Sequence, residues 1–176
     1  ETILQGEGWD RGWATIKAMS GNFRDITERS FGVPEAVNSG QVGYGIVIDF
    51  FAFSAQASGF PVKFVYPSVT AIVPANIAVV ANAPNKAGAE AFIEYLLSPA
   101  GQTLMFDPKI RRLPVNPAAY DKAPAGYPNP FKDPRLNSMV KFDVKKSEAR
   151  NDVVDALFDQ LVTFQLPALK DATKAI

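Results

Sequence analysis

Ser30 and Gly32 lie where a short helix is expected to begin, in the stretch from Ser30 to Glu35 that reads SFGVPE. A proline in the first turn and a glutamate near the positive end of the helix dipole both favour a helix start there. Backbone N–H groups at a helix start, with a hydroxyl beside them, can bind an anion, and Arg29 could pair with it. Each residue also has an ordinary role: Ser30 as a cap or turn, Gly32 as a flexible turn position and Arg29 as a solvated cation.

Asp49 follows directly on the apolar stretch Val42–Ile48, and Phe50 and Phe51 come after it. A carboxylate at the end of a predicted strand can accept hydrogen bonds from an amine or hydroxyl of a ligand, or hold a cation. The alternative for Asp49 is to cap the helix that follows. The two phenyl rings can wall a pocket or belong to the core, and Asn76, just after a proline break, can line a pocket or form a turn.

The chain contains no His and no Cys. The absence of His removes imidazole acid–base catalysis, triads that use His and most zinc chemistry, and the absence of Cys removes thiolate sites. Paired carboxylates such as Glu35 and Asp49 remain open to an acid–base enzyme in principle, but no spacing singles them out. The sequence therefore favours a protein that is not an enzyme, with no catalytic residue, no metal site and no cofactor.

Composition fits a globular protein, since hydrophobic residues make up 47% of the 176 residues and charged residues 20%. Lys and Arg number 18, as do Asp and Glu, so the net charge of zero gives no reason to expect a nucleic-acid partner. No apolar run reaches the roughly 18 residues that span a bilayer.

The elements that must position these residues alternate between strands and helices, which predicts an α/β fold. Apolar spacing predicts helices around residues 9–19, 31–38, 51–58, 86–97, 99–107 and 148–164, and a last helical segment after Pro167. Strands are predicted at residues 22–27, 42–48, 61–66 and 72–80. Five prolines and glycines between residues 123 and 134 predict an irregular arm.

The most specific pattern runs from Val79 to Tyr120 and reads VVANAPNKAGAEAFIEYLLSPAGQTLMFDPKIRRLPVNPAAY. A strand ends in an Ala-Pro-Asn turn, a helix follows, and Ser98 and Pro99 cap and start a second helix. The chain then leaves through Arg-Leu-Pro-Val-Asn-Pro. This order, together with the segment from Gly32 to Val42, resembles family 1 extracellular solute-binding proteins of bacterial ABC importers, in their ferric-ion-binding-protein-like branch.

The resemblance implies a portion of a periplasmic-binding-protein type II fold, with two lobes of mixed sheets flanked by helices. It assigns residues 1–74 to the later part of the second lobe and residues 75–120 to a returning segment of the first. Residues 121–176 become a proline-rich arm and a C-terminal helix that packs on the second lobe. Most of the first lobe would then be missing, so we expect a fragment of a longer protein that can self-associate through its exposed apolar face.

The resemblance also implies a role. Iron binders of this branch carry two adjacent tyrosines where this sequence has Phe50 and Phe51, and phenyl rings offer no oxygen to iron. We therefore expect a small organic anion, a phosphonate or a phosphorylated compound, held in a pocket that includes Ser30, Gly32 and Asp49. Arg29, Asn76 and the two phenylalanines complete the predicted site.

The expected partners are this small-molecule ligand and the membrane permease of an ABC transporter, and the expected location is periplasmic or extracellular. Two alternatives stay open. One is a ligand-sensing input domain of a signalling system, and the other is a ferric-ion carrier.

Overall fold

The computed structural model describes residues 1–137 and 140–175, leaving the side chains of Arg135 and Asn137 aside, and helices account for 52% of the chain. The α-helices are α1 (Thr2–Glu7), α2 (Trp9–Ser20), α3 (Gly32–Asn38), α4 (Asp49–Ala57), α5 (Lys86–Leu97), α6 (Pro99–Leu104), α7 (Pro134–Asn137), α8 (Val144–Phe158) and α9 (Leu166–Lys174). A 3-10 turn, η1 (Pro117–Lys122), follows α6, and a π-helical turn, η2 (Asp159–Thr163), links α8 to α9. The helices predicted in these regions are confirmed, with shifted ends.

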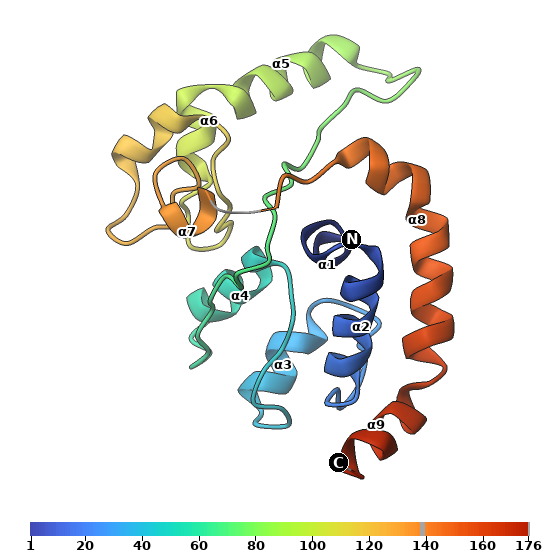
Figure 1. The fold of residues 1–176 in the computed structure, drawn as a ribbon. Coiled ribbons are helices and arrows are strands. Elements are labelled where there is room, and N and C mark those ends of the chain that lie inside the picture. The colour runs from blue at the N-terminus through green and yellow to red at the C-terminus, as the bar shows by residue number, and fades with distance from the viewer. Residues whose placement is uncertain (138–139, 176) are drawn as a thin grey trace.

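The first helices pack against the last ones. Leu4 of α1 and Trp13 of α2 meet Val154 of α8 and Val162 of η2 in one buried cluster, and Figure 1 shows α8 and α9 curving along the outer side of α1 and α2. Val162 is completely buried. The apolar stripe of α2 is therefore mainly core, as its helical spacing predicts. Outside the cluster, Arg150 of α8 forms an ion pair with Glu1 at 2.9 Å, which links α8 to the first residue of the chain.

The corner between α5 and α6 is built by a few specific contacts. The Ser98 hydroxyl accepts a hydrogen bond from the Gly101 N–H at 3.2 Å, so Ser98 caps α6 as predicted. Gly101 has room for no side chain, because a Cβ there would lie 2.1 Å from the carbonyl oxygen of Tyr95. The amide of buried Gln102 donates to the Leu96 carbonyl at 2.8 Å and accepts from the N–H groups of Val115 and Asn116 at 2.8 and 3.1 Å. One side chain thus joins the end of α5 to the segment that leaves α6.

The proline-rich arm turns back onto this corner. Phe106 lies edge-on to Tyr120, at a ring separation of 5.7 Å, and to Tyr127, at 4.9 Å. The Tyr120 hydroxyl donates to the Pro114 carbonyl at 3.1 Å, and the Tyr127 hydroxyl donates to the Arg112 carbonyl at 2.9 Å. The arm is irregular, as its prolines predict, yet it holds the backbone of residues 112–114 in place.

The prediction of an α/β fold with mixed sheets is wrong for the described part of the chain, where no residue lies in a strand. The segments 42–48, 61–66 and 72–80 are extended, but their backbone hydrogen bonds reach only neighbouring turns. Several of their apolar side chains stay open to solvent: Tyr44 is 96% exposed, Val65 80% and Val80 72%. Alternating apolar residues favour an extended backbone, whereas a strand also needs a second extended segment beside it. No such partner lies beside these segments among residues 1–137 and 140–175.

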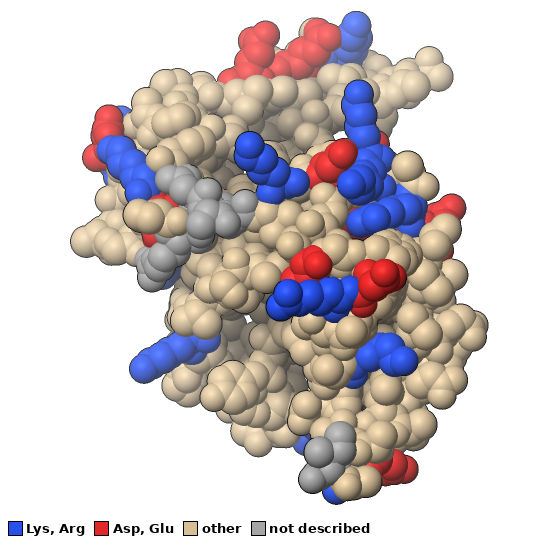
Figure 2. All heavy atoms as spheres, viewed as in Figure 1, with Lys and Arg blue, Asp and Glu red and all other residues tan. Residues whose placement is uncertain are grey.

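The arrangement leaves three groups of helices: α1, α2, α8 and α9 with η2; α3 with α4; and α5 and α6 with η1. No buried residue occurs in α5, which exposes Phe92, Tyr95 and Leu97. In Figure 2 the charged side chains of both signs are interspersed on the face shown, with wide uncharged areas between them. The assignment of residues 1–74, 75–120 and 121–176 to lobes stays a prediction, as does self-association.

We expect Gln102→Leu to lower the free energy of unfolding by about 1–3 kcal/mol, because it removes the partners of partly buried backbone groups of Leu96, Val115 and Asn116. Gln160→Leu, at an exposed position in η2, is the matched control and should change stability by less than about 0.5 kcal/mol. Urea unfolding followed by circular dichroism measures both. Equal stability of the two variants would show that the Gln102 amide does not hold this corner.

Candidate ligand-binding site

Asp49 and Phe50 form the first turn of α4. One carboxylate oxygen of Asp49 accepts a hydrogen bond from the Phe50 N–H at 2.8 Å, and the other accepts one from the Tyr66 hydroxyl, also at 2.8 Å. Ile48, at the N-cap of α4, offers no side-chain oxygen. Asp49 therefore binds a first-turn N–H in its place, while the remaining lone pairs of its carboxylate stay open to another donor.

Three tyrosines lie within electrostatic range of Asp49. Burial first, and then the charge of Asp49 and its hydrogen bond, raise the pKa of Tyr66 far above the usual value near 10. Burial also raises the pKa of Tyr120 and of Tyr127, and Asp49 adds to both shifts. Since Tyr120 and Tyr127 belong to the arm and its preceding turn, the start of α4 and the α6 corner face each other here.

An aromatic row extends from the start of α3 to the α6 corner. Phe31 lies edge-on to Phe51 at a ring separation of 4.8 Å, and Phe51 lies 4.3 Å from Phe50. The guanidinium of Arg112 is stacked over Phe50, with its central carbon 3.4 Å from the ring centre. Phe50 and Phe51 are half-buried and Phe31 is 63% exposed, so the row is a wall at the surface and not a closed core.

Arg111 and Arg112 were not among the residues that the sequence singled out. Arg111 has a φ of 48°, an uncommon backbone conformation for a residue with a side chain. Its buried Nε donates to no partner among the described residues, and its charge lowers the pKa of Tyr127 against the dominant effect of burial. Adjacent arginines in the segment leaving α6 were a visible signal, but the sequence does not show that this segment meets α4.

The structure supports a role at this wall for the other predicted residues to different extents. Ser30 is half-buried just before Phe31, the N-cap of α3, and its hydroxyl makes no hydrogen bond with the described residues. A Cβ at Gly32 would lie 3.2 Å from the side chain of Thr27, which would have to shift by a few tenths of an ångström to admit it. Arg29 and Asn76 are both exposed, and Asn76 lies outside the helices. Their roles in binding stay predictions.

Two hollows of the described surface lie elsewhere. Shallow depressions of about 250 and 340 Å³ occur along α9 and between α2, η2 and α9. They are lined mainly by lysine, glutamine and aliphatic side chains and include none of the predicted residues. The described residues hold no group of three or more acidic side chains that could bind a metal ion. The wall of Phe31, Phe51 and Phe50 is thus an open surface that could form one side of a site.

Comparison with known proteins decides the family. The sequence profile of bacterial extracellular solute-binding proteins matches residues 1–134. The chain belongs to this family. The resemblance of the Val79–Tyr120 pattern to such solute-binding proteins is thereby confirmed at the level of the family. Among the described residues of this solute-binding protein, no helix is long and apolar enough to cross a membrane.

Two curated relatives are similar to this chain over its whole length. The phosphoglycerate transport regulatory proteins PgtC of Salmonella typhimurium (strain LT2) and Salmonella typhi are each 36% identical over 176 residues. The alignment covers all of this chain but 43% of each relative, so the chain spans less than half of their length. No solved structure matches the chain significantly.

The buried Tyr66 hydroxyl should make the protein sensitive to alkaline pH. An unfolded tyrosine loses its proton near pH 10, whereas the raised pKa keeps folded Tyr66 protonated to higher pH. The stabilising contribution is therefore complete below about pH 10 and lost as the pH rises further. We expect Tyr66→Phe to lower stability at pH 8 by about 1–2 kcal/mol, through loss of the bond to Asp49, and to weaken the alkaline decline.

Urea unfolding between pH 8 and 11 measures this effect. Tyr44→Phe is the matched control, because Tyr44 is 96% exposed and has no hydrogen-bond partner to lose. An alkaline decline that is as steep in Tyr66→Phe as in the unmodified protein would contradict the assigned role of Tyr66.

Proposed function

We propose that this solute-binding protein captures a small organic anion with a phosphonate or phosphoryl group and delivers it, chemically unchanged, to the membrane permease of an ABC-type importer. The observation that carries the proposal is the stacking of Arg112 on Phe50, beside Asp49. A guanidinium recognises phosphate oxygens through paired hydrogen bonds, an aromatic wall contacts the carbon part of a ligand, and a carboxylate accepts from its hydroxyl groups.

The relatives support the same ligand class, since their name refers to phosphoglycerate transport. The family is extracellular by description, which supports a periplasmic or extracellular location. Binding without conversion is supported by membership of a family described as solute-binding.

The ligand class can be tested on the full-length protein by titration calorimetry with 3-phosphoglycerate, a phosphonate and ferric citrate. We expect saturable binding of a phosphorylated or phosphonate compound and recovery of the same compound after incubation. Phe50 and Phe51 offer no oxygen to iron, so ferric citrate should give no visible tyrosinate-to-iron absorption band. Appearance of that band would favour the ferric carrier, and formation of a product would favour an enzyme.

A second candidate function is ligand sensing, because the relatives are named regulatory proteins. A sensor and a carrier bind the same ligand but differ in what the bound protein does. We expect deletion of the gene to abolish uptake of the radiolabelled ligand even when the importer genes are expressed from a constitutive promoter. Restored uptake under that promoter would assign the protein to regulation, since the carrier step would then not need it.

A further inference from the structure

Arg111 and Arg112 are neighbouring cations that form no ion pair with a carboxylate among the described residues. Elsewhere in the same structure arginines do find partners: Arg150 lies 2.9 Å from Glu1, and Arg11 lies 3.7 Å from Glu7. The positive charge at residues 111 and 112 is therefore not neutralised by the protein, and it sits beside the aromatic wall. This combination suits a ligand that brings its own negative charge.

The stacking of Arg112 orients its hydrogen-bond donors. A guanidinium lying flat on a ring uses its face for the ring, whereas its N–H groups project in the plane around the edge. The backbone of Arg112 is held by its N–H bond to the Met105 carbonyl at 3.0 Å and by the Tyr127 hydroxyl on its own carbonyl. The side chain makes no hydrogen bond with the described residues, so its fork is preorganised and open.

Arg111 carries a second positive charge one residue before Arg112. Its guanidinium is near enough to the Tyr127 hydroxyl to act on it electrostatically, and its Nε is buried without an acceptor among the described residues. The backbone conformation at φ 48° is costly for a residue with a side chain and persists only where the surrounding contacts hold it. Arg111 is thus half-buried, whereas Arg112 is exposed and its guanidinium contacts Phe50.

We propose that Arg112, stacked on Phe50, binds the phosphoryl group of the ligand through a bidentate pair of hydrogen bonds, and that Arg111 supplies a second positive charge. The carbon part of the ligand lies against Phe50 and Phe51, and Asp49 accepts from a ligand hydroxyl. This assignment rests on the proposed function and names the residues that recognise the anion. A phosphoryl group carries a charge of about −1.5 to −2 near neutral pH. This charge balances two guanidinium groups more closely than the single negative charge of a ligand carboxylate would.

The test uses the full-length protein, with 3-phosphoglycerate and its unphosphorylated analogue glycerate as probes in titration calorimetry. We expect Arg112→Gln to weaken 3-phosphoglycerate binding by about 10- to 100-fold, the range for hydrogen bonds to a charged group, and to change the weaker glycerate binding far less. Arg112→Lys should restore little of the loss, because an ammonium lacks the fork. Phe50→Leu keeps an apolar side chain but removes the stacking surface, and should weaken 3-phosphoglycerate binding to a smaller extent.

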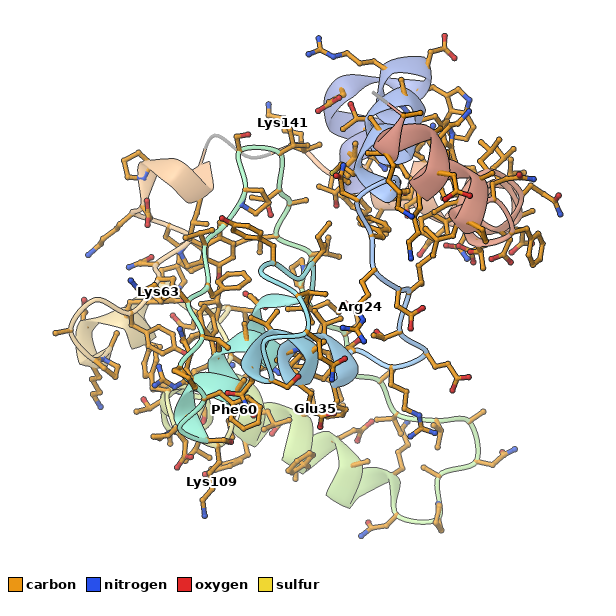
Figure 3. All side chains as sticks on the ribbon, turned by 90° about the horizontal axis from the view of Figure 1, so that it is seen from below. Arg24, Glu35, Phe60, Lys63, Lys109 and Lys141 are labelled. Carbon is orange, nitrogen blue, oxygen red and sulfur yellow. The ribbon has the colours of Figure 1, made fainter. Side chains whose placement is uncertain are left out.

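Lys109→Gln is the matched control. Lys109 lies three residues before Arg112 and is likewise exposed, but Figure 3 shows it pointing away from the body of the protein. This variant should bind 3-phosphoglycerate as the unmodified protein does, and thermal melts should show all variants folded. If the unmodified protein binds 3-phosphoglycerate and Arg112→Gln binds it equally well, the site assignment is overturned while the proposed function stands. If the unmodified protein binds neither this nor any other phosphorylated compound or phosphonate, both are overturned.

Discussion

The amide of Gln102 is the contact on which the α6 corner depends. It is the only side chain in the described part of this corner that bonds both to the end of α5 and to the segment leaving α6. A buried amide has to satisfy its donors and acceptors, and backbone groups in fixed positions are the partners here. The arrangement also explains Gly101, since the backbone of α5 passes too close for a Cβ. The Pro-x-Gly-Gln sequence therefore favours a sharp turn between two helices.

The corner between α5 and α6 also positions the segment that contacts the aromatic wall. Gln102 fixes residues 115 and 116, and Tyr120 and Tyr127 fix the carbonyls of residues 114 and 112, so the backbone from Arg112 onward has a defined direction. No backbone contact joins α4 to α6 or to η1. Side chains link these groups, through Arg112 on Phe50 and through the charge of Asp49 acting on Tyr120 and Tyr127. A junction made by side chains can adapt to a ligand more readily than a packed helix interface.

The chemistry of the wall suits recognition. Arginine and phenylalanine stack without losing the hydrogen-bonding edge of the guanidinium, and a carboxylate already bound to Tyr66 stays in position to accept from a hydroxyl. Such a site holds an anion by geometry and charge. Membership of the extracellular solute-binding family, and relatives named for phosphoglycerate transport, agree with this character.

Local structure was largely readable from the sequence. The helices α2, α3, α5 and α6 follow from apolar spacing and from the caps at Ser98 and Pro99, because helical hydrogen bonds and caps join residues close in sequence. The family was readable too, from the string between Val79 and Tyr120. Asp49, Phe50 and Phe51 were singled out for the same reason: they mark the boundary between an extended segment and a helix.

Tertiary structure decided the rest. Alternation at residues 42–48 and 72–80 predicts an extended backbone, but pairing into a sheet depends on distant segments, and the described residues place none beside them. The contact between Arg112 and Phe50 could not be predicted from the sequence either. It requires both the turn at Gln102 and the return of the proline-rich arm. The periodicity of apolar residues reports on contacts between residues that are close in sequence. Contacts between distant segments arise only when several local structures pack at once, and that information is spread over the whole chain.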